Sequence, residues 1–261
     1  MKKAISIVIA VICCLSSWAE ELKISGVYQG ENVYVMNPFV ASGTGYTVTG
    51  VIVNGTATTD DINSSAFEID LSKFELTKGD KVEIVIKHHE SSTPKIVNPE
   101  VLKPQSTFNV STIKVVNDSK LTWTTNGESG SLPFIVEQFR WNKWIKVATV
   151  DGKGTPGSNN YSTEVNVTSG YNRFRVKQID YTRKPRYGKE VKHRSMKAEI
   201  SYAFVKPFNE ITFSAETMYE LYNSKGVLIE KGLGTKINTT KLGPDSYYLN
   251  FDTKTEVLKK K

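Results

Sequence analysis

The sequence predicts an all-β fold made of two tandem β-sandwiches and a smaller β-rich block at the C-terminal end. Helical periodicity is almost absent after residue 19, whereas alternation of apolar and polar residues recurs. Turn signals rich in glycine and asparagine separate these short alternating runs. Apolar residues make up 39% of the chain and aromatic residues 10%, which is enough for packed cores and argues against a disordered chain.

The first nineteen residues have the layout of a secretory signal peptide. Lys2 and Lys3 give a basic start, residues 4–15 form an apolar run, and Ser17-Trp18-Ala19 is a small-x-small cleavage signal. The apolar run is shorter than the roughly 20 residues that a membrane-spanning helix needs. We therefore expect cleavage before Glu20 and a mature chain, without a transmembrane segment, that is secreted or attached to the outer cell surface.

Both cysteines, Cys13 and Cys14, lie inside this leader, so the mature chain is expected to have no disulfide and no thiol chemistry. The net charge of the whole chain is +7, and it falls by two, to +5, when Lys2 and Lys3 are removed. This basic surplus motivates a search for an anionic partner.

Residues 20–105 are expected to form the first β-sandwich and a linker. Alternating runs predict strands at residues 22–25, 33–36, 46–53, 66–71 and 81–87. Asn54-Gly55 predicts a tight hairpin, because both residues tolerate positive φ. Pro94, Pro99 and Pro104 lie in a polar stretch, residues 91–104, and predict a linker because proline lacks the N–H that a sheet needs.

Residues 106–200 are expected to form the second sandwich. Strands are predicted at residues 121–124, 134–140, 144–150, 171–179 and 187–192, with residues 141–143 as a hairpin turn. Within residues 171–179, Phe174 and Val176 should face the core, while Arg173, Arg175 and Lys177 should face the other way.

Residues 201–261 are expected to form the small C-terminal block. A hairpin is predicted between residues 219–222 and 227–229, with further strands at residues 236–238 and 247–251. The chain ends on Lys259-Lys260-Lys261. About sixty residues is marginal for a domain without disulfides, but a tight β-unit of that size is feasible.

Three segments of the second sandwich carry a resemblance to a known family: Leu121-Thr-Trp-Thr124, Phe134-Ile-Val-Glu-Gln138, and the run from Tyr171 to Asp180. With them, residues 106–200 resemble the fibronectin type III-like module of Bacteroidetes surface proteins. The run from Tyr171 matches the penultimate strand of that family, where the arriving tyrosine caps a corner. The first sandwich is similar to immunoglobulin-like modules in general.

The C-terminal block carries a second resemblance. Residues 219–228, then residues 241–250, then the lysine ending follow the order of elements in the C-terminal sorting domain of type IX secretion. This resemblance implies that the export machinery recognises residues 206–261. It also implies passage across the outer membrane and removal of the tail, with attachment to lipopolysaccharide or release. The sequence departs from the family at Lys206-Pro-Phe-Asn209, which stands where Pro-Asn-Pro is common.

We expect no catalytic residue, no cofactor and no metal site. His88 and His89 are adjacent on a strand, so their side chains should point to opposite faces and cannot easily share a metal. Gly152-Lys-Gly-Thr-Pro-Gly157 has the spacing of a dinucleotide loop, but Pro156 and the polar residues after it lead into a strand. A phosphate site would need that loop to open a helix. The competing class is a polysaccharide-active hydrolase or its accessory carbohydrate-binding module, which would need paired carboxylates in a cleft.

Ten Lys or Arg residues between Arg173 and Lys197 stand against Asp180 and Glu190. Candidates for an anionic-polymer patch are Arg173, Arg175, Lys177, Arg183, Lys184 and Arg186. One interpretation is a binding face for lipopolysaccharide or an acidic glycan. The other is a hydrated face that protects an edge strand from pairing with other chains. Nucleic acid is not expected as a partner, because the chain carries an export signal.

Phe139, Trp141 and Trp144 form a second candidate group. Trp141 lies in a predicted turn, where burial is difficult, so Trp141 and Trp144 are candidates for stacking on sugar rings. Alternatively, Phe139 and Trp144 fill the core while Trp141 covers its end. Taken together, the sequence predicts an exported, non-enzymatic binding or structural protein of a bacterial surface or matrix, with a role in adhesion or glycan contact.

Overall fold

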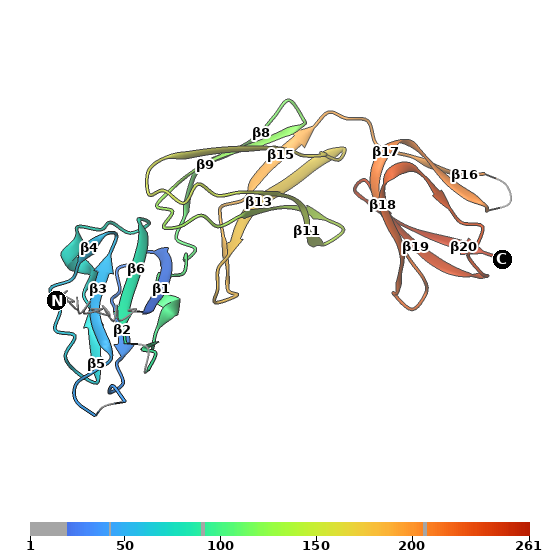
Figure 1. Ribbon diagram of the computed structural model, residues 1–261. Coiled ribbons are helices and arrows are strands. Elements are labelled where there is room, and N and C mark those ends of the chain that lie inside the picture. Colours follow the sequence, from blue (N-terminus) through green and yellow to red (C-terminus); the bar gives the residue numbers. More distant parts are fainter. Residues whose placement is uncertain (1–19, 42, 90–91, 206–207) are drawn as a thin grey trace, which may run out of the picture. The chain divides into compact units, whose positions relative to one another are not determined.

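A computed structural model describes residues 20–41, 43–89, 92–205 and 208–261 (Figure 1). Over these residues the fold is all-β apart from two short 3-10 helices, which confirms the predicted fold class. The chain divides into two compact units, Met1–Lys103 and Pro104–Lys261. The predicted signal peptide, residues 1–19, lies outside the described residues. Within the described ranges, no helix is long and apolar enough to cross a membrane.

Unit 1 is a sandwich of a four-stranded sheet, in the order β1-β6-β3-β4, and a three-stranded sheet, in the order β5-β2-β7. Alternate residues of β2 and β6 are buried, so the two sheets enclose a core that includes Val33, Val35, Ile84 and Ile86. The strands of this unit are β1 (Glu20–Val27), β2 (Val33–Met36), β3 (Val48–Val53), β4 (Thr56–Ala57), β5 (Ala66–Ile69), β6 (Lys81–His88) and β7 (Lys95–Ile96).

The predicted tight hairpin joins β3 to β4. Asn54 and Gly55 have φ angles of 47° and 85°, and Val53 pairs with Thr56 across the turn. Positive φ at both central residues is the geometry that suits the right-handed twist of paired strands. The Asn-Gly prediction is therefore confirmed.

Much of the stretch expected as a linker is built into unit 1. Its β7 pairs with β2, and the 3-10 helix η2 (Pro99–Leu102) buries Val101 and Leu102 to 5% and 2% exposure. Pro99 fits here because it begins η2, at a position where no N–H is needed. A second 3-10 helix, η1 (Leu71–Phe74), follows β5 and buries Leu71. The residues of β7 and η2 thus complete the core.

The two adjacent histidines of unit 1 lie at the end of β6. His88 is buried and its Nδ1 lies 3.0 Å from the carbonyl oxygen of His89, whose own side chain is exposed. The two rings therefore leave the strand on opposite sides, as expected, although His88 is not a solvated group.

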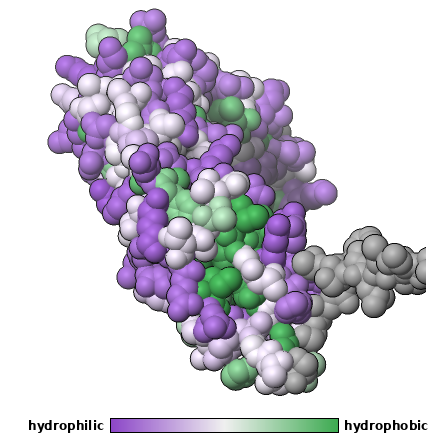
Figure 2. All heavy atoms as spheres, turned by 60° about the vertical axis from the view of Figure 1, so that its left-hand side comes forward, coloured by the Kyte–Doolittle hydropathy of each residue, from purple (hydrophilic) through white to green (hydrophobic). Residues whose placement is uncertain are grey.

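Tyr34 and Met36 of β2 are exposed, and Figure 2 shows hydrophobic residues gathered on one face of this unit among hydrophilic ones.

The second sandwich begins unit 2. It packs the sheet β12-β9-β8 against the sheet β11-β10-β13-β14, in which β15 also pairs with β13. Trp123, Phe134 and Phe174 are nearly fully buried between the sheets. The strands are β8 (Asn109–Val116), β9 (Lys120–Asn126), β10 (Phe134–Arg140), β11 (Lys143–Val150), β12 (Asn159–Glu164), β13 (Gly170–Ile179), β14 (Pro185–Tyr187) and β15 (Val191–Ser195). The single closing strand predicted at residues 187–192 is thus two strands, β14 and β15.

A buried carboxylate fixes the glycine-rich loop of this sandwich. Glu128 is 1% exposed and accepts hydrogen bonds from Thr125 Oγ1, from Tyr161 Oη at 2.8 Å and from the Gly154 amide at 2.8 Å. Burial is the main cause that raises the pKa of Tyr161 to about 12. Residues 152–157 lead into β12 and not into a helix, which confirms the prediction of an inter-strand loop.

The C-terminal block has its own core, built on Ile211, Leu221, Ile237, Leu249 and Phe251. The predicted hairpin is present, with Tyr222 paired to Leu228, but residues 236–238 are the end of its second strand and not a separate one. The lysine ending lies on the last strand, where Lys260 Nζ donates to the Thr239 carbonyl at 2.9 Å. The strands are β16 (Tyr202–Val205), β17 (Glu210–Tyr222), β18 (Leu228–Asn238), β19 (Asp245–Phe251) and β20 (Lys254–Lys260).

Buried polar contacts join this block to the second sandwich within unit 2. Asp252 is fully buried and accepts hydrogen bonds from the Ser169 amide at 2.9 Å, from Ser169 Oγ at 2.6 Å and from the Ile200 amide at 3.3 Å. Nearby, Lys143 Nζ lies 2.6 Å from Glu220 Oε2. A buried carboxylate that accepts several hydrogen bonds fixes the residues around it. The C-terminal block is therefore held against the second sandwich and not only linked to it through the chain.

Candidate functional site

The outer face of the β13 sheet is where the sequence-predicted residues meet. Phe174 and Val176 are fully buried, whereas Arg173, Arg175 and Lys177 lie on the opposite side and are half-buried, which confirms the predicted alternation. Strand β13 pairs with β10 on one side and with β14 and β15 on the other. The interpretation of these cations as protection for an edge strand is therefore wrong, because β13 is an interior strand.

Cations and aromatic rings alternate across this face. The Arg173 guanidinium carbon lies 4.6 Å from the ring centroid of Phe139, and the Arg175 guanidinium carbon lies 4.0 Å from Trp144 and 4.1 Å from Tyr187. Such distances are within the roughly 6 Å range of cation–π attraction. We call these five residues, together with Lys177, whose Nζ lies 5.8 Å from the Tyr187 centroid, the cation–aromatic ladder.

Two carboxylates balance part of the ladder's charge. Glu137, only 4% exposed, accepts from Arg175 Nε at 2.7 Å and from Lys177 Nζ. Glu190 accepts from Arg173 Nη2 at 2.6 Å, but both of these side chains are more than a third exposed, so solvent screens the pair. The three cations therefore keep part of their positive charge, and their side chains are fixed in position.

More positive charge surrounds the ladder along the same face. In the strand register, Lys192 of β15 is opposite Arg173 and Arg194 is opposite Tyr171. Tyr171 is 75% exposed, and the Arg194 guanidinium carbon lies 5.7 Å from its ring centroid. Cross-strand partners lie on the same side of a sheet, so these groups extend the basic and aromatic surface past the ladder.

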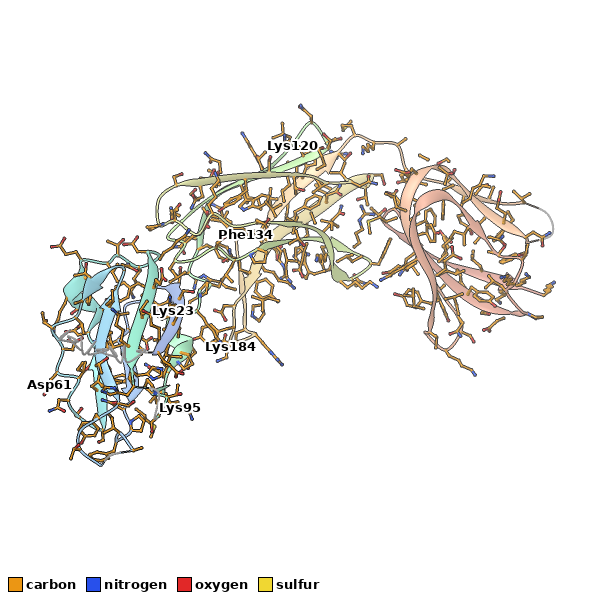
Figure 3. The ribbon with its side chains drawn as sticks, in the orientation of Figure 1. Lys23, Asp61, Lys95, Lys120, Phe134 and Lys184 are labelled. Atoms are coloured by element: carbon orange, nitrogen blue, oxygen red, sulfur yellow. The ribbon has the colours of Figure 1, made fainter. Side chains whose placement is uncertain are left out.

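The other predicted patch residues lie away from this face. Arg183, with φ of 62°, and Lys184 are exposed in the turn between β13 and β14, and Figure 3 labels Lys184 there. Arg186 is opposite the buried Gln178, and its Nε donates to the Phe108 carbonyl at 3.0 Å. The six predicted residues therefore divide into three on the ladder and three beside it.

The two tryptophans proposed for sugar stacking have different surroundings. Trp144 belongs to the ladder, where Phe139 packs edge-on against it at 5.3 Å, and neither residue is part of the buried core. The core-filling interpretation of Phe139 and Trp144 is thus wrong. Trp141 is half-buried at the end of the β10–β11 hairpin, where it lines a pocket shared with the C-terminal block.

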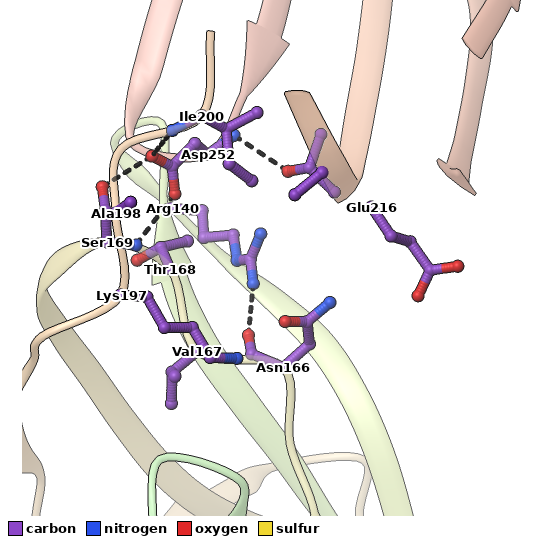
Figure 4. Close-up of a pocket in the computed structure, with 12 residues that line it drawn as sticks. Arg140, Asn166, Val167, Thr168, Ser169, Lys197, Ala198, Ile200, Glu216 and Asp252 are labelled. Atoms are coloured by element: carbon purple, nitrogen blue, oxygen red, sulfur yellow. Dashed lines mark hydrogen bonds between the residues drawn. The ribbon is translucent and has the colours of Figure 1, made fainter. Parts of the chain in front are cut away.

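A separate pocket of about 460 Å³ lies where Asp252 meets the sandwich (Figure 4). Two of its lining residues are acidic, Glu216 and Asp252, but in Figure 4 the Glu216 carboxylate points away from Asp252. Both oxygens of Asp252 already accept hydrogen bonds. Burial lowers the pKa of the neighbouring Arg140 to about 10, against the opposing effect of the Asp252 charge, so this guanidinium stays charged at neutral pH. The arrangement suits a structural link better than acid–base catalysis.

One constellation that the sequence did not reveal joins Asp118, His193 and Ser195. Asp118 accepts from Ser195 Oγ at 2.7 Å and pairs with His193 Nε2, and these bonds lower the pKa of its carboxyl group. A serine nucleophile would instead need its hydroxyl bonded to the imidazole. The hydrogen bonds of Asp118 therefore connect the turn between β8 and β9 to strand β15. Among the described residues, no group of three or more His, Cys, Asp or Glu could hold a metal ion.

No family model matches the chain, and no curated protein matches it. Among solved structures, a tetra-tandem repeat from the extending region of a large adhesion protein aligns with 91% of this chain and 72% of its own, at 11% identity and a TM-score of 0.33. The FN1–FN3 domains of chicken CNTN1 align with 91% of this chain and 97% of their own, at 12% identity and a TM-score of 0.27. A Bacteroides uniformis beta-glucuronidase 2 aligns with 74% of this chain and 27% of its own, at 10% identity and a TM-score of 0.21. At these TM-scores the likeness supports no conclusion about function.

Proposed function

We propose that this protein is an exported, non-enzymatic binding or structural protein of a bacterial surface or matrix, and that its cation–aromatic ladder contacts acidic polysaccharide. The observation that carries the proposal is the interleaving of Arg173 and Arg175 with the rings of Phe139, Trp144 and Tyr187 on an outer sheet face. An acidic polysaccharide combines anionic groups with the apolar faces of sugar rings, so it matches both parts of this surface.

Arg175 is already held in a binding conformation. Its guanidinium lies between two rings and donates through Nε to Glu137, while its terminal nitrogens have no hydrogen-bond partner among the described residues. A guanidinium fixed in this way loses little side-chain freedom when it accepts a carboxylate or sulfate, and its planar fork suits such a group.

The spacing of the cations suits a polymer more than a small anion. Arg173, Arg175 and Lys177 follow one another at every second residue of an extended strand. Successive side chains on one face of a strand are about 7 Å apart, so a chain of anionic sugars lying along β13 would meet several cations in turn. Individual contacts would be weak, and the affinity would come from their repetition.

The experiment is a binding assay with the chain from Glu20 to Lys261. Alginate and dextran sulfate supply the acidic polymers, and unmodified dextran is the neutral control. We expect retention on the two acidic polymers alone, and a steep loss as salt rises, because the Debye length shrinks from about 10 Å at about 0.1 M to about 3 Å at about 1 M. Equal binding to dextran, or binding that salt does not change, would reject charge as the cause.

The route out of the cell is the second part of the proposal. The signal-peptide layout of residues 1–19 and the sorting-domain resemblance of residues 206–261 support export by a type IX machinery, with the tail as its recognition element. Residues 196–199 are exposed and outside any strand, so they form an accessible place for tail removal. Mass spectrometry of both termini of the extracellular protein tests this route. A start at Glu20 and an end near residue 200 support it, whereas an intact Lys261 makes the C-terminal block a resident domain.

A further inference from the structure

Arg140, the last residue of β10, is a buried cation whose direct partners are both neutral. It is 5% exposed, its Nε donates to Gln138 Oε1 at 2.8 Å, and its Nη2 donates to the Asn166 carbonyl at 2.5 Å. In the described part of the chain two other arginines form ion pairs, and Arg140 forms none. Arginine is seldom buried unless it is paired with an anion. The burial of Arg140 therefore calls for a counter-charge that its direct contacts do not supply.

Asp252 compensates this charge only in part. Its oxygens accept from Ser169 and from the Ile200 amide and not from the guanidinium of Arg140. Burial lowers the pKa of Arg140 to about 10, and the charge of Asp252 opposes this effect without cancelling it. The guanidinium is thus charged at neutral pH, without a direct anionic partner among the residues that the structure describes.

One terminal nitrogen of Arg140 is open to the pocket of about 460 Å³ that it lines. Nη1 has no hydrogen-bond partner among the described residues. Over the same residues, the side-chain atoms that are both sealed from solvent and unpartnered are the indole nitrogens of Trp123 and Trp141, so Nη1 keeps accessible surface. Figure 4 shows the guanidinium among the lining residues, with one terminal nitrogen bonded to Asn166 and the other free of such a bond. A ligand in the pocket can therefore reach Nη1.

A second cation and an amide line the same pocket. Lys197 is exposed on the segment between β15 and β16, and no acceptor for its Nζ is found within the described ranges. The side-chain amide of Asn166 is likewise free of hydrogen bonds to described residues. The acidic residue Glu216 is also in the lining, but in Figure 4 its carboxylate points away from Arg140. The groups that are free to act on a ligand are thus mainly donors with positive charge.

We propose that this pocket binds a small molecule through an oxyanion group, a carboxylate, sulfate or phosphate, that accepts a hydrogen bond from Arg140 Nη1. Lys197 is the second, more exposed cation of the site, and the Asn166 amide is a further donor. Such charge-assisted bonds are strong where water is largely excluded. Arg140 is held in place by its two existing hydrogen bonds, so it loses little freedom on binding. The pocket volume is within the range of about 300–1,000 Å³ typical of small-molecule sites, so it has room for more than a bare ion.

This site is separate from the cation–aromatic ladder and does not depend on the acidic-polymer proposal. The test follows the backbone amide resonances of the ¹⁵N-labelled chain from Glu20 to Lys261 by NMR. Galacturonate, sulfate and phosphate are the probes, galactose is the neutral control, and sodium chloride keeps the ionic strength constant. We expect at least one anion to shift the resonances of residues 166–169 and 197–200 saturably, with a Kd of about 1 mM or below, and galactose to shift none. The anion that binds best separates a sugar acid from an inorganic source of the oxyanion.

Arg140→Gln removes the buried donor and should weaken that anion at least about tenfold. Arg183→Gln is the control, because it removes the same charge from the exposed turn beyond the other end of β13, and it should leave the Kd within about twofold. Lys197→Gln changes an exposed residue that folding does not require, and it should weaken binding about threefold. The proposal is overturned if no anion gives a saturable shift, if galactose shifts the same resonances, or if Arg140→Gln and Lys197→Gln bind as tightly as Arg183→Gln.

Discussion

The guanidinium carbon of Arg175 lies 4.0 Å from the ring centroid of Trp144, and its Nε donates to the buried carboxylate of Glu137. Through these two contacts Arg175 of β13 connects β11 and β10. The contacts explain why a charged residue on the outer face is only partly exposed, and why its orientation is fixed before any ligand arrives. The proposed function rests on this fixed guanidinium.

Replacing Glu137 by Gln should lower the stability of the protein but raise its affinity for alginate. Glu137→Gln removes the counter-charge of Arg175 and Lys177, so we expect the free energy of unfolding to fall by roughly 1–3 kcal/mol. The same change leaves two cations unbalanced, so affinity for alginate should rise. Urea unfolding and alginate binding measure the two effects. A variant that loses both stability and affinity would mean that the orientation that Glu137 gives to Arg175 matters more for binding than the charge that it neutralises.

The Tyr161 hydroxyl predicts a loss of stability at alkaline pH. Its ordinary pKa is 10.0 and burial raises it to about 12, so the folded state holds this proton more tightly than the unfolded state does. The stability that depends on this proton is complete below pH 10 and is lost as the pH rises toward 12. Tyr161→Phe should be less stable than the parent at pH 8, but should lose less between pH 8 and pH 11. Urea unfolding at both pH values measures this, and equal losses would refute it.

Two glycines of the dinucleotide-like motif should differ sharply. Gly154 has φ of +71°, and a Cβ there would lie 2.3 Å from the Ser131 amide nitrogen, whereas a Cβ at Gly157 meets nothing within 4 Å. Gly154→Ala should therefore cost more than about 2 kcal/mol in unfolding free energy, since strain and a backbone clash combine. Gly157→Ala should change it by less than about 0.5 kcal/mol. Thermal melts measure both, and similar melting temperatures would show that the motif has another role.

Asp252 should hold the C-terminal block on the sandwich. In Asp252→Asn, an amide NH₂ group takes the place of a carboxylate oxygen that accepts from Ser169 or Ile200 in the parent protein. Two hydrogen-bond donors would then face each other in a buried site. We expect a loss of roughly 2 kcal/mol and faster amide hydrogen exchange across residues 201–261. Asp245→Asn, at the more exposed start of β19 where Ser224 is the partner, is the control and should have little effect. Unchanged exchange in Asp252→Asn would mean that other contacts hold the block.

The sequence predicted most strands, and it predicted that Phe174 of β13 faces the core while Arg175 faces the other way. Such alternation of apolar and polar residues depends only on a few neighbouring residues. The ladder itself was not predictable, since Trp144, Arg175 and Tyr187 belong to three strands whose register the sequence does not state. Strands β8 and β12 were missed because exposed Thr, Ser and Asn side chains interrupt their apolar residues.

Buried polar residues were the larger omission. From the sequence alone, Glu128 and Asp252 would be expected on the surface. They are buried because Glu128 accepts a hydrogen bond from the Tyr161 hydroxyl and Asp252 accepts one from Ser169. The predicted linker, residues 91–104 with its three prolines, misled in the opposite direction, because a polar stretch with prolines can still pair at an edge strand and bury Val101 and Leu102.

The most direct test of the central claim compares two arginine variants for alginate binding. Arg175→Gln and Arg186→Gln remove the same charge, but Arg175 lies on the ladder and Arg186 is opposite the buried Gln178. The account predicts about a tenfold weaker Kd for Arg175→Gln, equivalent to about 1.4 kcal/mol, and less than a twofold change for Arg186→Gln. Equal losses in the two variants would mean that only net charge matters, and would contradict a binding site at the ladder.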